Sequence, residues 1–145
     1  MSSDHGRGPL AEAGRWLQQA QYDVESAEYC AAGERYSLAC FMAQQAAEKA
    51  VAGYLYARGA EDVWGHALAD LCEDARAFEP SFELIKPAAI LLDKHYILAR
   101  YPSALPGGIS ADAYDAAEAE RAVEIAREVV RFASERVSDI QPQEG

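Results

Sequence analysis

The residues best suited to chemistry lie between Leu92 and Pro102, where an aspartate, a tyrosine and an arginine are spaced for one face of a helix. Asp93, Tyr96 and Arg100 stand at positions i, i+3 and i+7. A rise of about 10 Å separates Asp93 from Arg100, so the two side chains do not bond directly. Arg100 has two interpretations: its planar guanidinium binds a phosphate in a cleft, or it stabilises the C-terminal end of its helix.

Glu48 is a second unusual residue, because it shares a predicted helical stripe with Phe41, Val51 and Leu55. A carboxylate that faces a core must be paired or neutral. We expect Arg100 or His66 to be its partner. The pattern favours a buried salt bridge over a catalytic acid.

Histidine and cysteine patterns indicate no metal site. The chain has three histidines and three cysteines, with neither an H-E-x-x-H motif nor a C-x-x-C pair. His66, just before an expected helix, is interpreted as a cap or packing group, and His95 as a partly buried core residue. The cysteines are expected to be reduced thiols. No cofactor is expected, because Pro106-Gly107-Gly108 lacks the lysine and the flanking strand of a phosphate-binding loop.

Size and charge restrict the class of protein. A chain of 145 residues suits one domain. The net charge of −11 repels phosphate backbones, so we expect no broad nucleic-acid surface, while a local site built around one or two arginines remains open. No apolar stretch approaches the roughly 18 residues of a membrane span, and the N-terminus lacks a secretory signal. We therefore expect a cytoplasmic protein that does not enter the membrane.

Helical periodicity positions these residues in an all-α fold. Gly33 and Gly59 are expected helix stops, Pro87 an interruption, and Ser110 the N-cap of the last helix. We expect an up-and-down antiparallel bundle of four long helices plus one short helix. The domain spans 10–137, between flexible ends at 1–9 and 138–145. The expected helices are 10–32, 36–58, 67–78 (short), 82–100 with a break near Lys86-Pro87, and one that begins near Ser110.

In this order and spacing, the chain resembles the HEPN family from about Leu10 to Val137. The resemblance is carried by short matches in successive helices: Trp16, Ala20, Asp23 and Ala27; Phe41, Gln44-Gln45-Ala46 and Glu48-Lys49-Ala50; Gly65-His66 with Leu68 and Leu71; Leu92-Asp93, Tyr96 and Arg100-Tyr101-Pro102; and Tyr114.

The resemblance implies a helical bundle that forms a homodimer, with the fourth-helix ends facing a shared cleft. It also implies a possible partner, a minimal nucleotidyltransferase, in a toxin–antitoxin-like system. Some members of the family are metal-independent ribonucleases that use an arginine followed four to six residues later by a histidine. Here Ser103 to Pro106 follow Arg100 without a histidine. An arginine cannot itself exchange the proton that RNA cleavage requires.

Three hypotheses follow. In the leading one the protein is a non-catalytic nucleotide-binding or protein-interaction module: Arg100 contacts phosphate, Tyr96 and Tyr101 stack or hydrogen-bond, and Asp93 orients the site. His66 and Glu48 are further candidate ligand-binding residues. The alternatives are a ribonuclease with a degenerate motif, in which His66 or His95 assists Arg100, and a purely structural dimer.

Overall fold

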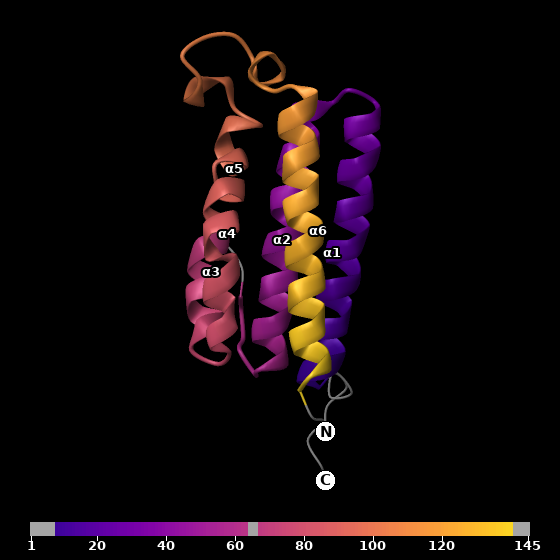
Figure 1. Ribbon diagram of the computed structural model, residues 1–145, viewed down its shortest axis with the longest axis vertical. Helices are drawn as coiled ribbons and strands as arrows, with labels where there is room; N and C mark the ends of the chain where they lie inside the picture. The colour runs from indigo at the N-terminus through magenta and orange to yellow at the C-terminus, as the bar shows by residue number, and fades with distance from the viewer. Residues whose placement is uncertain (1–7, 64–66, 141–145) are drawn as a thin grey trace.

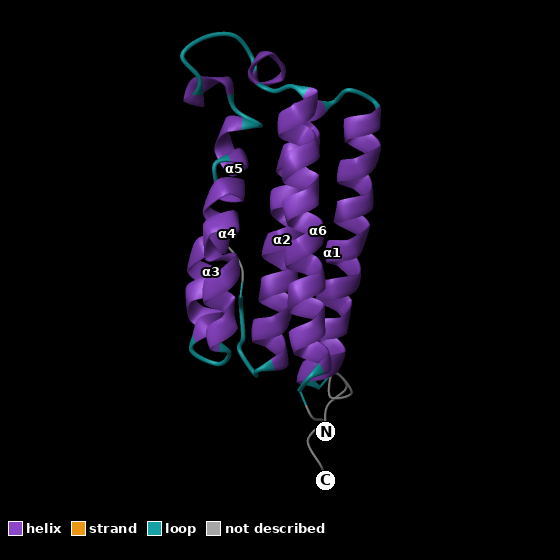
Figure 2. Ribbon diagram, in the orientation of Figure 1, coloured by secondary structure: helices purple, strands orange, loops and turns teal. Residues whose placement is uncertain are grey.

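The computed structural model describes residues 8–63 and 67–140, and within them the chain forms helices and loops without a strand (Figure 2). The all-α prediction is confirmed. Three long helices lie side by side: α1 (Pro9–Ala32), α2 (Tyr36–Ala57) and α6 (Ala116–Ser138). Helix α6 begins at the end of the bundle where α1 turns into α2 (Figure 1). None of the described helices is both long and apolar enough to cross a membrane.

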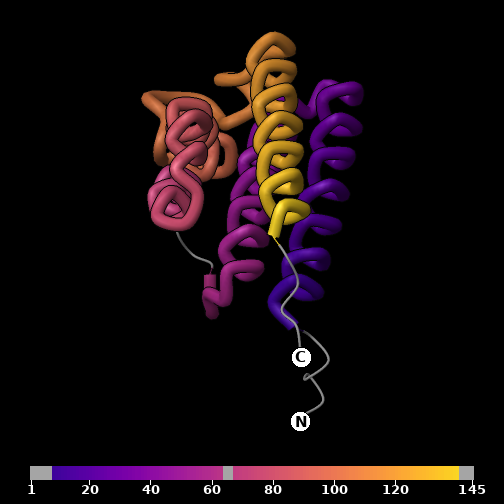
Figure 3. The backbone as a smooth tube through the Cα atoms, turned by 60° about the horizontal axis from the view of Figure 1, so that its bottom comes forward, coloured from indigo at the N-terminus to yellow at the C-terminus, as the bar shows by residue number. Residues whose placement is uncertain are grey.

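Shorter helices form an arm on the other side of α2 (Figure 1). The arm consists of α3 (Leu68–Arg76), the 3-10 helix η2 (Pro80–Ile85), α4 (Lys86–Asp93) and α5 (His95–Leu98). Seen from a second direction, the arm still stands beside the long helices (Figure 3). Helix α2 contacts both layers, which explains why so many of its residues are buried.

The turn between α1 and α2 ends α1 by a Schellman motif. Glu34 adopts a left-handed backbone with φ of 62°, its N–H bonds to the Ala31 carbonyl, and the Arg35 N–H bonds to the Cys30 carbonyl. Gly59, with φ of 95°, ends α2 in the same way and confirms the predicted stop. Gly33 is the C-cap of α1, as predicted, and the left-handed position is taken by the next residue, Glu34.

The Phe82 side chain packs the arm against the long helices. Phe82 of η2 is fully buried. Its ring centroid lies 4.7 Å from that of Tyr54 in α2 and 5.1 Å from that of Phe132 in α6. Offset and edge-on aromatic pairs of this kind add stability beyond the area they bury. Phe82 therefore joins the arm to two long helices at once.

Two expected boundaries differ from the structure. The last helix does not begin at Ser110: residues Ser110–Ala113 form the 3-10 helix η4, and α6 starts after Asp115, whose side chain accepts the N–H of Glu118. Asp115 is thus the N-cap that Ser110 was predicted to be. The predicted restart at Pro87 is confirmed, because Pro87 stands in the first turn of α4. A further break at Lys94 separates α4 from α5.

Close approach of α1 and α2 depends on Gly53. A Cβ atom there would lie 3.2 Å from the Trp16 Cβ and 3.4 Å from the Ala13 carbonyl oxygen. At Gly14, in contrast, a Cβ atom would meet nothing within 4 Å. A methyl group added at Gly53 would therefore crowd α1, whereas one added at Gly14 would meet open space.

We predict that Gly14→Ala raises the free energy of unfolding by about 1 kcal/mol, because alanine favours the helix. Gly53→Ala should lower it by about 1 kcal/mol, because overpacking between helices outweighs that gain. Urea denaturation followed by circular dichroism measures both. Equal stabilisation by the two substitutions would show that α1 and α2 separate readily at this point.

Candidate functional site

An exposed arginine beside three aromatic rings lies where the arm meets α2. The guanidinium carbon of Arg100 stands 4.5 Å from the centroid of Phe41, 4.7 Å from that of Tyr96 and 4.8 Å from that of Tyr101. The Arg100 Nε atom donates to the Tyr96 carbonyl oxygen at 3.0 Å. We call these four residues the Arg100 cluster. Cation–π attraction and one backbone hydrogen bond hold the guanidinium in place.

The Arg100 cluster offers positive charge to a ligand. Arg100 is exposed and, among the described residues, has no carboxylate partner. By contrast, Arg15, Lys49, Lys86 and Arg127 are each paired with an acidic side chain. A guanidinium has five N–H donors, of which the contact with Tyr96 uses one. The remaining donors suit the oxygens of a phosphate or a carboxylate.

Asp93 belongs to a different group of contacts. Its two carboxylate oxygens accept the backbone N–H groups of Leu68 and Ala69 at 2.8 and 2.9 Å. Asp93 therefore caps the N-terminus of α3, where a negative charge also complements the helix dipole. The buried Gln44 amide donates to Asp93 Oδ1 at 3.3 Å and to Glu48 Oε1 at 3.2 Å. Gln45 in turn donates to the Gln44 oxygen at 2.7 Å.

The structure thus divides the predicted site residues between two groups. Tyr96, Arg100 and Tyr101 lie together in the Arg100 cluster, while Asp93 and Glu48 lie with Gln44 and Gln45. We call the second group the Gln44 network. Asp93 was expected to help orient the site; its carboxylate binds the backbone of α3 and the Gln44 amide. His66 lies outside the described residues.

Phe41 is the member of the Arg100 cluster that the sequence patterns did not assign to a site. It shares a predicted stripe with Val51 and Leu55, and the helical pattern therefore indicated a core position. Phe41 is in fact half-buried, and its ring forms the shortest of the three contacts with Arg100. One indication of a role for Phe41 was present in the sequence: it belongs to the second-helix residues that resemble the HEPN family, three positions before Gln44.

His95 is buried and faces away from solvent. It is 3% exposed, its Nδ1 atom lies 2.8 Å from the Tyr114 hydroxyl, and its Nε2 atom lies 3.7 Å from Glu118. Burial lowers the pKa of His95 to about 4; the Glu118 carboxylate opposes this shift, and Lys94 adds to it. His95 is therefore neutral near pH 7. The expectation of a core histidine agrees with this placement.

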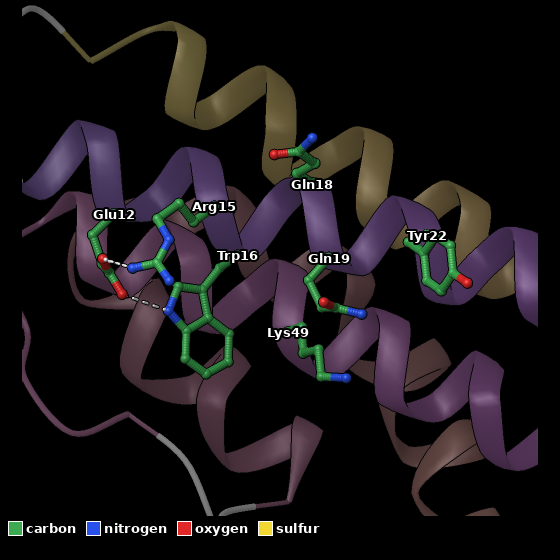
Figure 4. A pocket seen from close by; sticks show the side chains of 7 residues that line it. All are labelled: Glu12, Arg15, Trp16, Gln18, Gln19, Tyr22 and Lys49. Carbon is green, nitrogen blue, oxygen red and sulfur yellow. Dashed lines mark hydrogen bonds and ion pairs between the residues drawn. The ribbon is translucent and has the colours of Figure 1, made fainter.

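A wide groove of about 680 Å³ runs along α1 and α2 (Figure 4). Its two basic groups are already neutralised: Arg15 pairs with Glu12 at 3.1 Å, and Lys49 pairs with the buried Asp23 at 2.5 Å. Trp16 also donates to Glu12 at 3.1 Å. The groove offers less free positive charge than the Arg100 cluster. No three His, Cys, Asp or Glu side chains in 8–63 and 67–140 form a group that suits a metal.

We predict that acid destabilises the protein partly through His95. Its folded-state pKa of about 4 lies below the ordinary 6.5, so the unfolded chain binds a proton first as the pH falls. This contribution to stability is complete above about pH 6.5 and declines towards pH 4, by up to about 3 kcal/mol. Urea denaturation at about pH 7 and about pH 4.5 measures the decline. His95→Gln, which does not titrate, should lose less stability over this interval; parallel losses would contradict the assignment.

Known proteins share both the sequence pattern and the architecture of this chain. The HEPN domain profile matches residues 13–137. The crystal structure of TT1696 from Thermus thermophilus superposes with a TM-score of 0.81 at 40% identity, covering 86% of this chain and 98% of that one. ST0689, an archaeal HEPN homologue, gives 0.72 at 32% identity, covering 87% and 98%. An HEPN domain protein from Thermotoga maritima gives 0.70 at 32% identity, covering 87% and 99%.

No curated protein matches the chain. The domain profile covers most of the residues, and the three solved structures share both the fold and 32–40% of the sequence. Together with the order of helices around α2, these findings establish that the chain belongs to the HEPN domain family.

Proposed function

We propose that this protein is a nucleotide-binding module in which the Arg100 cluster holds a phosphate and stacks a base. The observation that carries the proposal is the exposed guanidinium, fixed among three rings and without a carboxylate partner among the described residues. Arg15 and Arg127, by contrast, each pair with a glutamate. Arg100 instead keeps its charge available.

The rings around Arg100 support a ligand with both a charged and a flat part. Tyr96 is 44% exposed and Tyr101 is 46% exposed, so part of each ring is open to solvent. Stacking of a base on an aromatic ring contributes about 1–3 kcal/mol and tolerates different bases. A phosphate bound by the free edge of the guanidinium adds charge-assisted hydrogen bonds. A nucleotide is the common ligand class that uses both.

The charge of the protein limits the size of this ligand. A long nucleic acid would bring many phosphates against a chain of net charge −11, with one unpaired arginine in the cluster to receive them. A mononucleotide brings one phosphate group to one arginine. The proposal is therefore for a small nucleotide.

We predict that adenosine 5′-monophosphate binds saturably in isothermal titration calorimetry, and that Arg100→Ala weakens binding by about tenfold to a hundredfold. Tyr101→Ala should weaken binding of the nucleotide but leave the weaker binding of inorganic phosphate unchanged. Arg131→Ala is the matched control, because Arg131 is also exposed and lies on α6. Absence of saturable binding, or equal affinity in the Arg100 and Arg131 variants, would overturn the proposal.

Cleavage of RNA in the presence of a metal chelator, lost in Arg100→Ala, would favour the ribonuclease alternative.

We also propose that the protein acts as a homodimer through the arm. Four large apolar side chains along η2, α4 and α5 are exposed: Leu84, Ile90, Leu91 and Ile97, with exposed fractions of 76, 57, 42 and 44%. We call them the arm patch. Exposed apolar surface on a small protein is typical of an interface.

Light scattering after size exclusion should give a mass near twice 15.8 kDa for the wild-type protein. Ile90→Glu together with Ile97→Glu should give the monomer mass, because a buried carboxylate without a partner opposes association. Tyr29→Glu is the control: Tyr29 is 83% exposed, and it lies on α1 outside the arm. A monomeric wild-type protein, or a dimer unaffected by the double substitution, would contradict this assignment.

A further inference from the structure

A second groove lies between the end of α1 and the beginning of α6. Its volume is about 410 Å³, and it shares no residue with the Arg100 cluster or the arm patch. Residues of α1, α6 and the first turn of α2 line it: Glu28, Ala31, Ala32, Tyr36, Ala116, Glu120, Val123, Glu124 and Arg127. We call it the α1–α6 groove. We propose that it docks a basic, amphipathic segment of a partner protein.

The floor of the groove is apolar and its side chains are small. Ala31, Ala32 and Val123 supply small apolar side chains to the lining, together with the half-buried Tyr36. Floor positions of this size accept an inserted apolar side chain of a partner, as grooves that bind amphipathic helices do. The apolar face of the proposed partner segment would therefore contact the floor of the groove.

The rim of the groove is acidic and partly uncompensated. Glu120 and Glu124 are exposed and stand one turn apart on α6, at positions i and i+4. Neither has a cationic partner among the described residues. Two like charges at this spacing repel and weaken a helix slightly. A cation placed between them would remove that repulsion, which gives a basic ligand an advantage over a neutral one.

An ion pair within the groove shows how a guanidinium fits there. Arg127 of α6 reaches across to Glu28 of α1, with both Nε and Nη2 at 2.7 Å from the Glu28 Oε2 atom. The carboxylate on the α1 side is thus within reach of a cation that spans the groove. A partner arginine or lysine beside Glu120 and Glu124 would form the same kind of contact at the neighbouring turn.

Charge also decides between possible occupants. The homodimer is proposed at the arm patch, and the net charge of −11 gives a second copy of this chain no advantage at the acidic rim. A phosphate or nucleic acid is repelled by the carboxylates of the rim. A basic protein segment is attracted, and its apolar side chains find the floor. The groove is therefore assigned a positively charged partner, independently of the nucleotide proposal.

The test uses a synthetic helical peptide with lysines on one face and leucines on the other, titrated into the full-length protein in about 0.15 M salt. Binding is followed by calorimetry and by NMR shifts of the backbone amides. We expect saturable binding with the largest shifts at Ala31, Ala32 and Val123. A peptide in which serines replace the leucines should bind at least tenfold more weakly. Equal binding of the two peptides, or shifts centred elsewhere, would overturn the proposal.

Matched variants separate the groove from the overall charge. Glu120→Gln with Glu124→Gln should weaken binding of the leucine–lysine peptide about tenfold. The control pair Glu25→Gln with Glu61→Gln removes the same charge from exposed positions outside the groove and should change affinity less than twofold. Arg127→Ala frees Glu28 and should tighten binding severalfold. Equal weakening by the two double variants would show that the peptide responds only to the overall charge of the protein. That result, or no tightening in Arg127→Ala, would refute the site.

Discussion

The position of the arm depends on the carboxylate of Asp93. Helices α3 and α4 have nine and eight residues, too few to be stable alone in water. Asp93 at the end of α4 caps the start of α3, and the buried Gln44 bonds the same carboxylate to α2. One charged group therefore joins three helices. It is partly buried, and its hydrogen bonds offset the loss of hydration.

The Arg100 cluster follows from that constraint. The Gln44 network fixes the end of α4 against α2, and after the break at Lys94 the short α5 continues along α2. Phe41 stands three residues before Gln44 on α2, so the same helix that receives Asp93 also supplies a ring for Arg100. The polar network and the cationic cluster are thus neighbouring parts of one junction: the first positions the arm, and the second presents charge at its end.

Much of the fold was predictable from local signals, because those signals are strong and short in range. Apolar periodicity located α1 and α2 to within a residue or two, Gly59 marked a stop, and Pro87 marked the restart at α4. The start of α6 was missed because Ser110 and Asp115 are both good N-caps, and sequence alone does not say which one a helix uses. The contacts of Asp93 were not predictable from spacing along one helix, because its partners Leu68, Ala69 and Gln44 lie on other helices.

The Arg100 cluster, the arm patch and the α1–α6 groove lie on different parts of the bundle, and this arrangement follows from where α2 is buried. With the arm on one side of α2 and α1 and α6 on the other, the Arg100 cluster lies at the junction between α2 and the arm, and the arm patch lies on the arm itself. The α1–α6 groove is left to the opposite layer. None of the three shares a residue with another. The nucleotide, the second copy of the chain and the basic partner that we propose would therefore contact different side chains.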